Sequence, residues 1–471
     1  MPADAQGLSL TGTAEGAAAY DRGIGHLLRF QPAVVGAAEE SAATGCALGG
    51  VLGAYLNLMS TEAGAVTAAS DLLGGYATGQ ADESALTSRE RAHLAVARRW
   101  IAGDMGGAGA LLGDISVRYP RDLLALFTGH QIDFFRGDAV NLRDRIGRVL
   151  SAWDPELPET GYLYGMYAFG LEECNQYGQS AEAGQQAVSR NADDVWGIHA
   201  VVHTYEMRGA IPEGVRFMRQ CRGNWADGNF LNVHNAWHYA LYLLQGGEYD
   251  KAFEVYDTFL HHDGSDDVAL ELLDASALLW RLHLEGASVG DRWAPLAGAW
   301  DRVLDPGFYP FNDMHAIMAY VGAGQAERAG QVLRALETVA GEPSAREIPN
   351  TGQEMTVTVG LPVCRAILDF GAGRYESVID GLLPIRTRVH EFGGSHAQRD
   401  AVERTLLEAA VRAGRDDLAA ALVGERLANR ECSTYAWTKR SLLLAARGDQ
   451  TGAAAASRRA DEFVTDIRAA L

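Results

Sequence analysis

Apolar residues recur with the spacing of amphipathic helices along nearly the whole chain, and no segment sustains the alternation typical of a strand. Several segments fit the tetratricopeptide repeat, a helix pair of 34 residues with small and aromatic residues at fixed positions. In "WHYALYLLQGGEYDKAFEVYDTFL", Ala240, Ala252 and Tyr256 take consensus positions, and Gly247 takes the turn between the two helices. Segments that begin at Ala95 and Trp437 fit the same frame.

Glycines mark the predicted turns between paired helices, at some intervals of 34 residues and others of 38 or more. The predicted turn glycines are Gly103, Gly137, Gly247, Gly286, Gly324, Gly414 and Gly448. Two helix starts carry capping boxes, Thr87 with Glu90 and Ser395 with Gln398. The sequence therefore predicts an all-α fold, a right-handed superhelical solenoid of degenerate tetratricopeptide-like helix pairs.

Domain organisation follows from this repeat, because no linker divides the chain. We predict a single solenoid domain over residues 1–471, with diverged helices in 1–80 and tetratricopeptide-like repeats in 85–460. The polar segment 336–355 is predicted to be a loop insertion between repeats. The apolar run that begins at Cys46 is too short and too rich in glycine to span a bilayer, so we expect a buried helix there.

The net charge of the chain limits the classes of binding partner that we expect. The 40 Lys+Arg and 61 Asp+Glu residues give a net charge of −21, which repels phosphate backbones and anionic lipid surfaces, so we expect neither nucleic acid nor membrane as a partner. The five cysteines show no metal-binding or paired spacing, and the N-terminus shows no secretory signal. These features favour a reducing, cytoplasmic location. They make no prediction of oligomeric state.

Two histidine pairs stand out, each with a spacing of four residues and one pair 35 residues after the other. "HAVVH" holds His199 and His203, and "HNAWH" holds His234 and His238. In the register of the repeat, both pairs fall on the helix face opposite the packing face. That face of successive first helices lines the concave surface of a solenoid. We therefore expect all four imidazoles, with Glu206 on the same face, to line one groove.

The same face carries further candidates for ligand binding. Trp237 borders the stripe, and Trp280, Asp313 and His315 fall on or near it in later repeats. Arg399, beside the second capping box, has no structural explanation in the sequence and joins this group. The predicted groove is thus rich in histidine and tryptophan.

Three interpretations of the histidines stay open at this point. His199, His203, His234 and His238 could ligate a divalent transition metal such as zinc, iron or manganese, with Glu206 as an oxygen ligand or a base. Neutral imidazoles could instead act as acid and base groups without metal. They could also be partly buried structural residues, since this spacing alone is a weak motif.

Two functions follow from these alternatives. The first is a small-molecule site in the groove, either metal-assisted or based on histidine acid–base catalysis by His199, His203, Glu206, His234 and His238. If the protein is an enzyme, these groups suit chemistry of the hydrolase or lyase type. The second is a scaffold that binds a peptide segment of a partner protein in the same groove.

Other polar residues have structural interpretations. Glu173 falls where the repeat favours an aromatic side chain, and we expect it to form an ion pair. His130 and Asp133 fall on the packing face, where we expect buried residues with satisfied hydrogen bonds.

Several longer strings resemble the tetratricopeptide repeat protein 38 family, in order from about residue 10 to 405. They include "YAFGLEECNQY", "DVWGIHAVVHTYEM", "FNDMHAIMA" and "LLPIRTRVHEFGGSHAQRD". The residues that match the family pattern are His199, His203, Glu206, His234, Trp237, His238, Asp313, His315, Gln398, Arg399 and Asp400. His396 stands where the family has asparagine, so it should not be essential. The resemblance implies a soluble α-solenoid and supplies no reaction.

Overall fold

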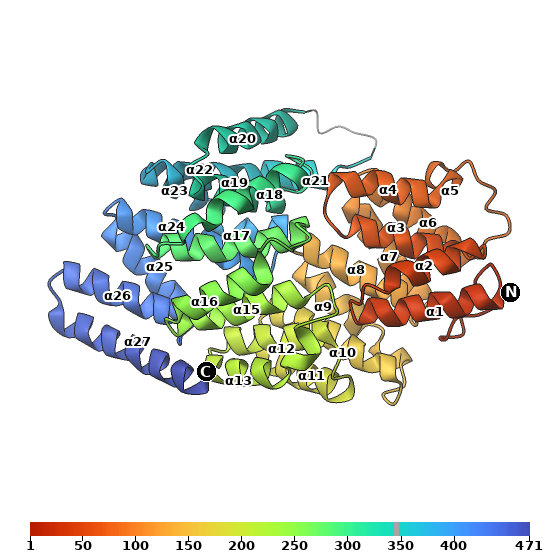
Figure 1. The fold of residues 1–471 in the computed structure, drawn as a ribbon, viewed down its shortest axis with the longest axis horizontal. Coiled ribbons are helices and arrows are strands. Elements are labelled where there is room, and N and C mark those ends of the chain that lie inside the picture. The colour runs from red at the N-terminus through yellow and green to blue at the C-terminus, as the bar shows by residue number, and fades with distance from the viewer. Residues whose placement is uncertain (343–347) are drawn as a thin grey trace.

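The computed structural model describes residues 1–342 and 348–471, and it is built from α-helices joined by short turns (Figure 1). Consecutive helices pack on one another along the chain, as α10 packs on α11 and on α12. Within the described residues there is no β-strand, only an isolated bridge between Ala3 and Ser9. The predicted all-α, tetratricopeptide-like solenoid is confirmed.

The helices have the following bounds. The N-terminal ones are α1 (Ala14–Leu28), α2 (Val34–Ala43), α3 (Ala47–Leu58), α4 (Ala63–Leu73), α5 (Gly75–Thr78), α6 (Ser88–Ile101) and α7 (Met105–Arg118). The central ones are α8 (Leu123–Phe135), α9 (Ala139–Gly147), α10 (Pro158–Glu173), α11 (Tyr177–Arg190), α12 (Val195–Met207), α13 (Ile211–Gln220), α14 (Arg222–Trp225), α15 (Asn232–Gln245), α16 (Tyr249–Val255), α17 (Ala269–Leu284) and α18 (Trp293–Val303). The C-terminal ones are α19 (Pro310–Gly322), α20 (Ala326–Gly341), α21 (Thr351–Met355), α22 (Leu361–Gly371), α23 (Tyr375–Leu382), α24 (His396–Arg412), α25 (Asp416–Asn429), α26 (Thr434–Ala446) and α27 (Gln450–Ala470). Short 3₁₀ or π segments lie at Leu150–Ala152, Tyr256–Leu260, Gly290–Arg292, Thr356–Gly360 and Arg386–Phe392.

The turns explain why the chain breaks into pairs. All seven glycines predicted as turns have positive φ, a conformation that glycine adopts at little cost. Gly209, between α12 and α13, has φ 68° and was missed because no tetratricopeptide frame was fitted there. Both predicted capping boxes are present, Thr87 with Glu90 at α6 and Ser395 with Gln398 at α24.

The predicted loop insertion over 336–355 is helical at both ends. Helix α20 runs to Gly341, and α21 begins at Thr351. Residues 343–347 of this segment lie outside the described residues. The polar composition that suggested a loop also suits an exposed helix end, which explains the difference at residues 336–341.

The solenoid closes on itself instead of leaving its inner face open. Figure 1 places α1–α7 at one end of the long axis and α26–α27 at the other. Between these ends, the Asn312 side chain of α19 donates to the backbone of Thr61, and the Thr351 amide of α21 donates to the Gly103 carbonyl at 3.0 Å. These contacts join segments about 250 residues apart in the sequence and tie the C-terminal half to the N-terminal helices.

Helix α24 completes the closure by crossing the inner face of the central helices. The Arg281 guanidinium of α17 donates to the Ala397 carbonyl, and the Trp280 indole donates to Thr405 Oγ1 at 2.9 Å. On its other side, Arg399 pairs with Glu173 of α10 at 2.9 Å. The concave face that the sequence predicted as a groove is therefore part of the protein interior.

The apolar run that begins at Cys46 forms the buried helix α3, as predicted. A search of the described residues finds no helix with the length and apolar character needed to cross a membrane.

Candidate functional site

Four histidines meet at the centre of the molecule, two from α12 and two from α15. We call His199, His203, His234 and His238 the tetrahistidine cluster. Their ring centroids lie 4.3 Å apart between His203 and His238, 4.4 Å between His199 and His203, and 4.8 Å between His199 and His234. One ring nitrogen from each residue lies within 4.8 Å of the others. The expectation that both pairs come together is confirmed.

The two pairs do not occupy the same place in their repeats. Gly209 follows His203 by six residues, whereas Gly247 follows His238 by nine. The turns are thus 38 residues apart while the histidine pairs are 35 apart, an offset of about one helical turn. The equal register inferred from the sequence was wrong, yet an offset of one turn keeps both pairs on inner faces that meet.

The cluster is buried, contrary to the open groove that the sequence predicted. His203 and His238 are fully buried, His199 is 1% exposed, and the His234 side chain is 14% exposed. Burial lowers the pKa of His199, His203 and His238 well below 6.5, and repulsion between the neighbouring imidazoles adds to this effect. These three imidazoles are therefore neutral at pH 7, which is the form that ligates a metal.

Three carboxylates, two buried and one 11% exposed, lie next to the imidazoles. Asp274 of α17 lies 2.7 Å from Nδ1 of His234, within hydrogen-bond distance. Glu172 of α10 lies 3.6 Å from Nδ1 of His203, and Glu206 of α12 lies 3.7 Å from Nδ1 of His238. In each case the carboxylate is at Nδ1, so the Nε2 atom of that ring is left for another partner.

Several atoms of this centre are buried without a hydrogen bond. Within the described parts of the chain, both ring nitrogens of His203 and of His238 have no hydrogen-bond partner, nor has Nδ1 of His199. His234 and His199 share one contact, 3.1 Å between their Nε2 atoms. Native proteins pair most buried polar atoms, so a group of unpaired ones at one point indicates a binding site.

A second group, Glu172, Glu173 and His396, adjoins the cluster through Glu172. Nδ1 of His396 lies 3.2 Å from Glu172 Oε1, and the His396 amide donates to Glu173 at 2.7 Å. Burial and the Glu173 charge raise the pKa of Glu172 to about 7. The pKa of Glu173 is lowered instead, because His396 and Arg399 outweigh its burial. The predicted ion pair of Glu173 is present, and its partner is Arg399.

Glu206 leads to a separate buried ionic network. Its carboxylate lies 3.6 Å from Arg430, which lies 3.2 Å from Asp400. Asp400 also pairs with Arg404 at 2.9 Å. The surrounding guanidinium groups hold the pKa of Asp400 well below its usual range against the effect of burial. This network fixes Glu206 behind His238.

The predicted ligand-binding residues have different surroundings. The Trp237 ring stacks on His234, with ring centroids 5.3 Å apart, and so belongs to the cluster. Trp280 is bonded to Thr405, and Arg399 is held by Glu173 and the Gly394 carbonyl. Asp313 accepts from the Gly307 amide at 3.0 Å, where burial raises its pKa to about 8.

His315 lies in α19, where Nδ1 is 2.8 Å from the Phe311 carbonyl. Burial lowers its pKa to about 3. None of Trp280, Asp313, His315 and Arg399 is among the residues that the structure places at the cluster or at the cavity beside it.

His130 and Asp133 are buried with partners, as predicted, but they do not pair with each other. His130 Nε2 accepts from the Trp196 indole at 3.1 Å, and Asp133 binds Arg145 at 2.7 Å. They are structural residues.

A cavity of about 480 Å³ opens beside the cluster, and we call it the apolar cavity. Its walls come from α1–α3, α8, α12, α15, α17, α19 and α24, and two members of the cluster, His199 and His234, form part of them. Most other lining side chains are aliphatic or aromatic, among them Phe30, Met59, Phe127, Phe134, Trp196, Leu231, Leu270 and Phe311. The tetrahistidine cluster thus borders a space of the size typical for small-molecule sites.

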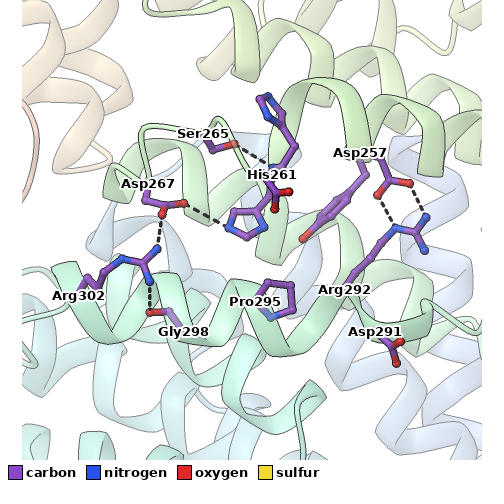
Figure 2. Close-up of a pocket in the computed structure, with 12 residues that line it drawn as sticks. Asp257, His261, Ser265, Asp267, Asp291, Arg292, Pro295, Gly298 and Arg302 are labelled. Carbon is purple, nitrogen blue, oxygen red and sulfur yellow. Dashed lines mark hydrogen bonds and ion pairs between the residues drawn. The ribbon is translucent and has the colours of Figure 1, made fainter.

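A second pocket, of about 670 Å³, lies between the Tyr256–Leu260 segment and α18 (Figure 2). Its charged side chains mostly neutralise one another. Asp267 contacts His261 at 3.3 Å and also Arg302, and Arg292 pairs with Asp257 at 2.8 Å. It forms no metal-binding group of the kind seen at the tetrahistidine cluster among the described residues.

Sequence reasoning missed Asp274, Glu172 and the apolar cavity. Asp274 is the one acid within the apolar stretch "LLDASALLW", a pattern that signals a buried charge with a partner. Glu172 lies next to Glu173 in "FGLEECN", but the repeat frame drew attention to the second residue only. The cavity has no such signal, because its walls come from nine separate helices.

No protein-family model matches the chain. Solved structures to which it is similar include a monomeric mutant of IFIT1 with Gppp-AAAA, at 13% identity over 96% of both chains and a TM-score of 0.39. A human IFIT1 dimer with PPP-AAAA matches at 14% identity over 87% of this chain and 94% of that chain, with a TM-score of 0.40. A human IFIT1 dimer with m7Gppp-AAAA matches at 14% identity over 93% and 89%, with a TM-score of 0.39. The solenoid fold itself is shown by the consecutive helix pairs of this chain.

Proposed function

We propose that the protein binds a divalent transition metal at the tetrahistidine cluster and a small molecule in the apolar cavity beside it. His199, His203, His234 and His238 would hold the metal, which we take to be zinc, iron or manganese as the sequence suggested. Imidazole nitrogen is a common ligand of zinc and iron, and nearby carboxylates extend the choice to manganese.

The observation that carries this proposal is the orientation of the rings. Nδ1 of His234 is within hydrogen-bond distance of Asp274 at 2.7 Å, and Nδ1 of His203 and of His238 each has a carboxylate nearby, at 3.6 and 3.7 Å, without a hydrogen bond. Metal-ligating histidines usually point their second ring nitrogen at a carboxylate, which fixes the tautomer and strengthens the ligand. The same arrangement leaves the Nε2 atoms of these three rings without a carboxylate partner.

Glu206 has a narrower role in this proposal than the sequence suggested. Its Oε2 atom lies behind His238, and its Oε1 atom lies 3.6 Å from Arg430. We therefore propose that it orients a ligand histidine, and it is not among the groups that lie close enough together to share one metal with the four imidazoles.

A metal bound here would supply Lewis acidity to an oxygen of the molecule in the cavity. His199 and His234 connect the two sites, because they belong to the cluster and line the cavity. We propose chemistry of the hydrolase or lyase type for this pair of sites. The alternative of a peptide held on the concave face is less well supported, because α24 covers that face.

The experiment is metal analysis of the full-length protein by mass spectrometry after dialysis against metal-free buffer. Wild type should retain about one equivalent of one transition metal, and the double variant His203→Ala, His238→Ala should retain less than a tenth of that. His262→Ala, which changes an exposed histidine outside the cluster, is the control and should retain the wild-type amount. Equal metal in wild type and double variant, or no uptake of zinc, iron or manganese by wild type, would contradict the proposal.

We further propose that the chain is a member of the tetratricopeptide repeat protein 38 family, supported by the strings around both histidine pairs. A cytoplasmic location and the absence of nucleic-acid partners stay predictions from the scattered cysteines and the net charge of −21.

A further inference from the structure

We propose that the natural ligand of the apolar cavity is a neutral, lipid-like alcohol or ketone, whose oxygen is held by polar side chains of the wall such as His199, His234 and Gln131. This inference rests on the proposed function in one respect, namely the metal site that would contact the oxygen of the ligand. The preference for a neutral apolar body rests on the cavity alone.

The walls indicate an apolar body for the ligand. The lining side chains are mostly aliphatic or aromatic, and they come from helices on opposite sides of the cavity. Each apolar contact with a ligand removes hydrocarbon from water, so an apolar body is favoured over a sugar or a nucleotide.

The charged residues of the cavity wall disfavour an anionic group along its apolar part. The described residues that line the cavity include no lysine or arginine, and the one acid among them is Glu271. Burial, followed by the charge of Asp266, raises the pKa of Glu271 to about 7. Along the apolar walls, away from the metal proposed at the tetrahistidine cluster, a carboxylate or phosphate would be buried without a counter-ion, which costs several kcal/mol.

A few polar side chains interrupt the apolar wall, namely Asn57, Ser60, Gln131, His199, His234, Glu271 and Gln398. His199 and His234 bring imidazole nitrogens to the wall, and Gln131 lines the same cavity. Gln131 is 6% exposed, and its Nε2 donor has no hydrogen-bond partner in the described structure. A ligand oxygen that accepts from this amide would satisfy a buried donor, which favours an alcohol or ketone over a hydrocarbon.

The rim gives an apolar molecule a route of entry. Val35, Phe230 and Val268 line the cavity and are nevertheless 47%, 50% and 38% exposed. Large apolar side chains that line one cavity and are also exposed favour a site of binding over ordinary surface.

The test is fluorescence titration with N-phenyl-1-naphthylamine, a neutral apolar probe, followed by competition with 1-decanol and with decanoate at pH 7.5. We expect the probe to bind and 1-decanol to displace it at a concentration at least tenfold lower than decanoate. Displacement by decanoate at equal or lower concentration would overturn the inference.

Three variants locate the site. Leu270→Trp fills the cavity and should weaken probe binding at least tenfold, whereas Leu442→Trp, at an exposed leucine elsewhere, should leave it unchanged. Gln131→Leu should leave the probe affinity within twofold and weaken competition by 1-decanol about threefold to tenfold. Unchanged probe binding in Leu270→Trp would place the probe elsewhere and overturn the inference, and circular dichroism of each variant identifies any that fails to fold.

The same titration on the His203→Ala, His238→Ala variant separates the two proposals. If the variant binds the probe but no metal, the result supports ligand binding in the cavity. The metal proposal is then decided by the metal analysis alone. A protein that retains metal and binds no probe would overturn this inference and leave the metal site standing.

Discussion

Two buried histidine sites in this protein have the same exposure and different surroundings. His93 of α6 is fully buried, and both of its ring nitrogens have partners, Asp122 at 3.1 Å and the Tyr55 hydroxyl at 3.0 Å. His203 of α12 is equally buried, and neither of its ring nitrogens has a hydrogen bond within the described residues.

The difference separates structural histidines from candidate ligands. A buried polar atom lowers stability unless it is paired, so the His93 site contributes to the fold as it stands. The tetrahistidine cluster gathers several unpaired nitrogens at one point, and its cost is offset only if something binds there. Burial of a histidine is therefore a poor guide to function, and the pairing of its nitrogens is a better one.

The largest effect should come from breaking the His93 site. Asp122→Ala removes the partner of His93, a 3.5 Å contact with Arg89 and the N-cap of α8. We expect the free energy of unfolding to fall by about 3–5 kcal/mol, because one change breaks a buried ion pair, leaves the buried Nε2 of His93 without a partner and removes a helix cap, although Arg89 keeps Asp4 as a partner. Urea denaturation followed by circular dichroism measures this. Metal content should not change, and a loss of metal would show that the two sites are not independent.

Metal bound at the tetrahistidine cluster should stabilise the folded protein. At a free metal concentration of 100 times the Kd, wild type should gain about 2.7 kcal/mol by mass action. Thermal melts with and without zinc, iron or manganese test this, and Asp122→Asn should show the same gain as wild type. A gain of the same size in the His203→Ala, His238→Ala variant would place the stabilising metal outside the cluster.

The carboxylates behind the imidazoles should tune the metal affinity. Asp274→Asn and Glu172→Gln are each expected to weaken metal binding about 10- to 100-fold, because they remove the groups that orient His234 and His203. Competition with a chelator of known affinity measures the change. Glu376→Gln, at an exposed carboxylate, is the control. Unchanged affinity in both buried variants would argue against carboxylate-supported ligands.

Low pH should reduce the stability that Asp122 contributes at the His93 site. His93 and Arg89 lower the pKa of Asp122 to about 2 against the effect of burial, compared with 3.8 ordinarily. A lowered pKa in the folded state stabilises above the unfolded pKa, and this contribution is lost as the pH falls through the folded one. The stability gap between wild type and Asp122→Asn should narrow by about 2 kcal/mol between pH 5 and pH 2. A gap that is independent of pH would remove Asp122 as the titrating group.

The smallest effect is expected at His396. Its side chain is 21% exposed and lies at the edge of the cluster, next to Glu172 and Glu173. His396→Asn should change stability by less than about 1 kcal/mol and leave metal content unchanged, since partly exposed ion pairs contribute little. Loss of metal in this variant would extend the site to His396 and contradict its predicted dispensability.

Much of the local structure could be predicted from the sequence. Turn glycines such as Gly247 and capping boxes such as Thr87 with Glu90 act over a few residues, so their effects can be read directly from the chain. The gathering of the histidine pairs also followed from local rules, since residues four apart share a helix face. The prediction that both histidine pairs occupy the same repeat positions was wrong. Three extra residues separate Gly209 from Gly247, and they can be recognised only when both turn positions are known.

The sequence by itself determined the helices, their pairing and the two histidine stripes, because these depend on contacts between near neighbours in the chain. Only the tertiary structure decided that the stripes face a closed interior. That closure depends on contacts such as Arg399 with Glu173, 226 residues apart, and Asn312 with Thr61, 251 apart. The same long-range packing placed Asp274 and Glu172 behind the imidazoles and formed the apolar cavity. No local pattern encodes such contacts, since each depends on how many successive helix pairs rotate and stack.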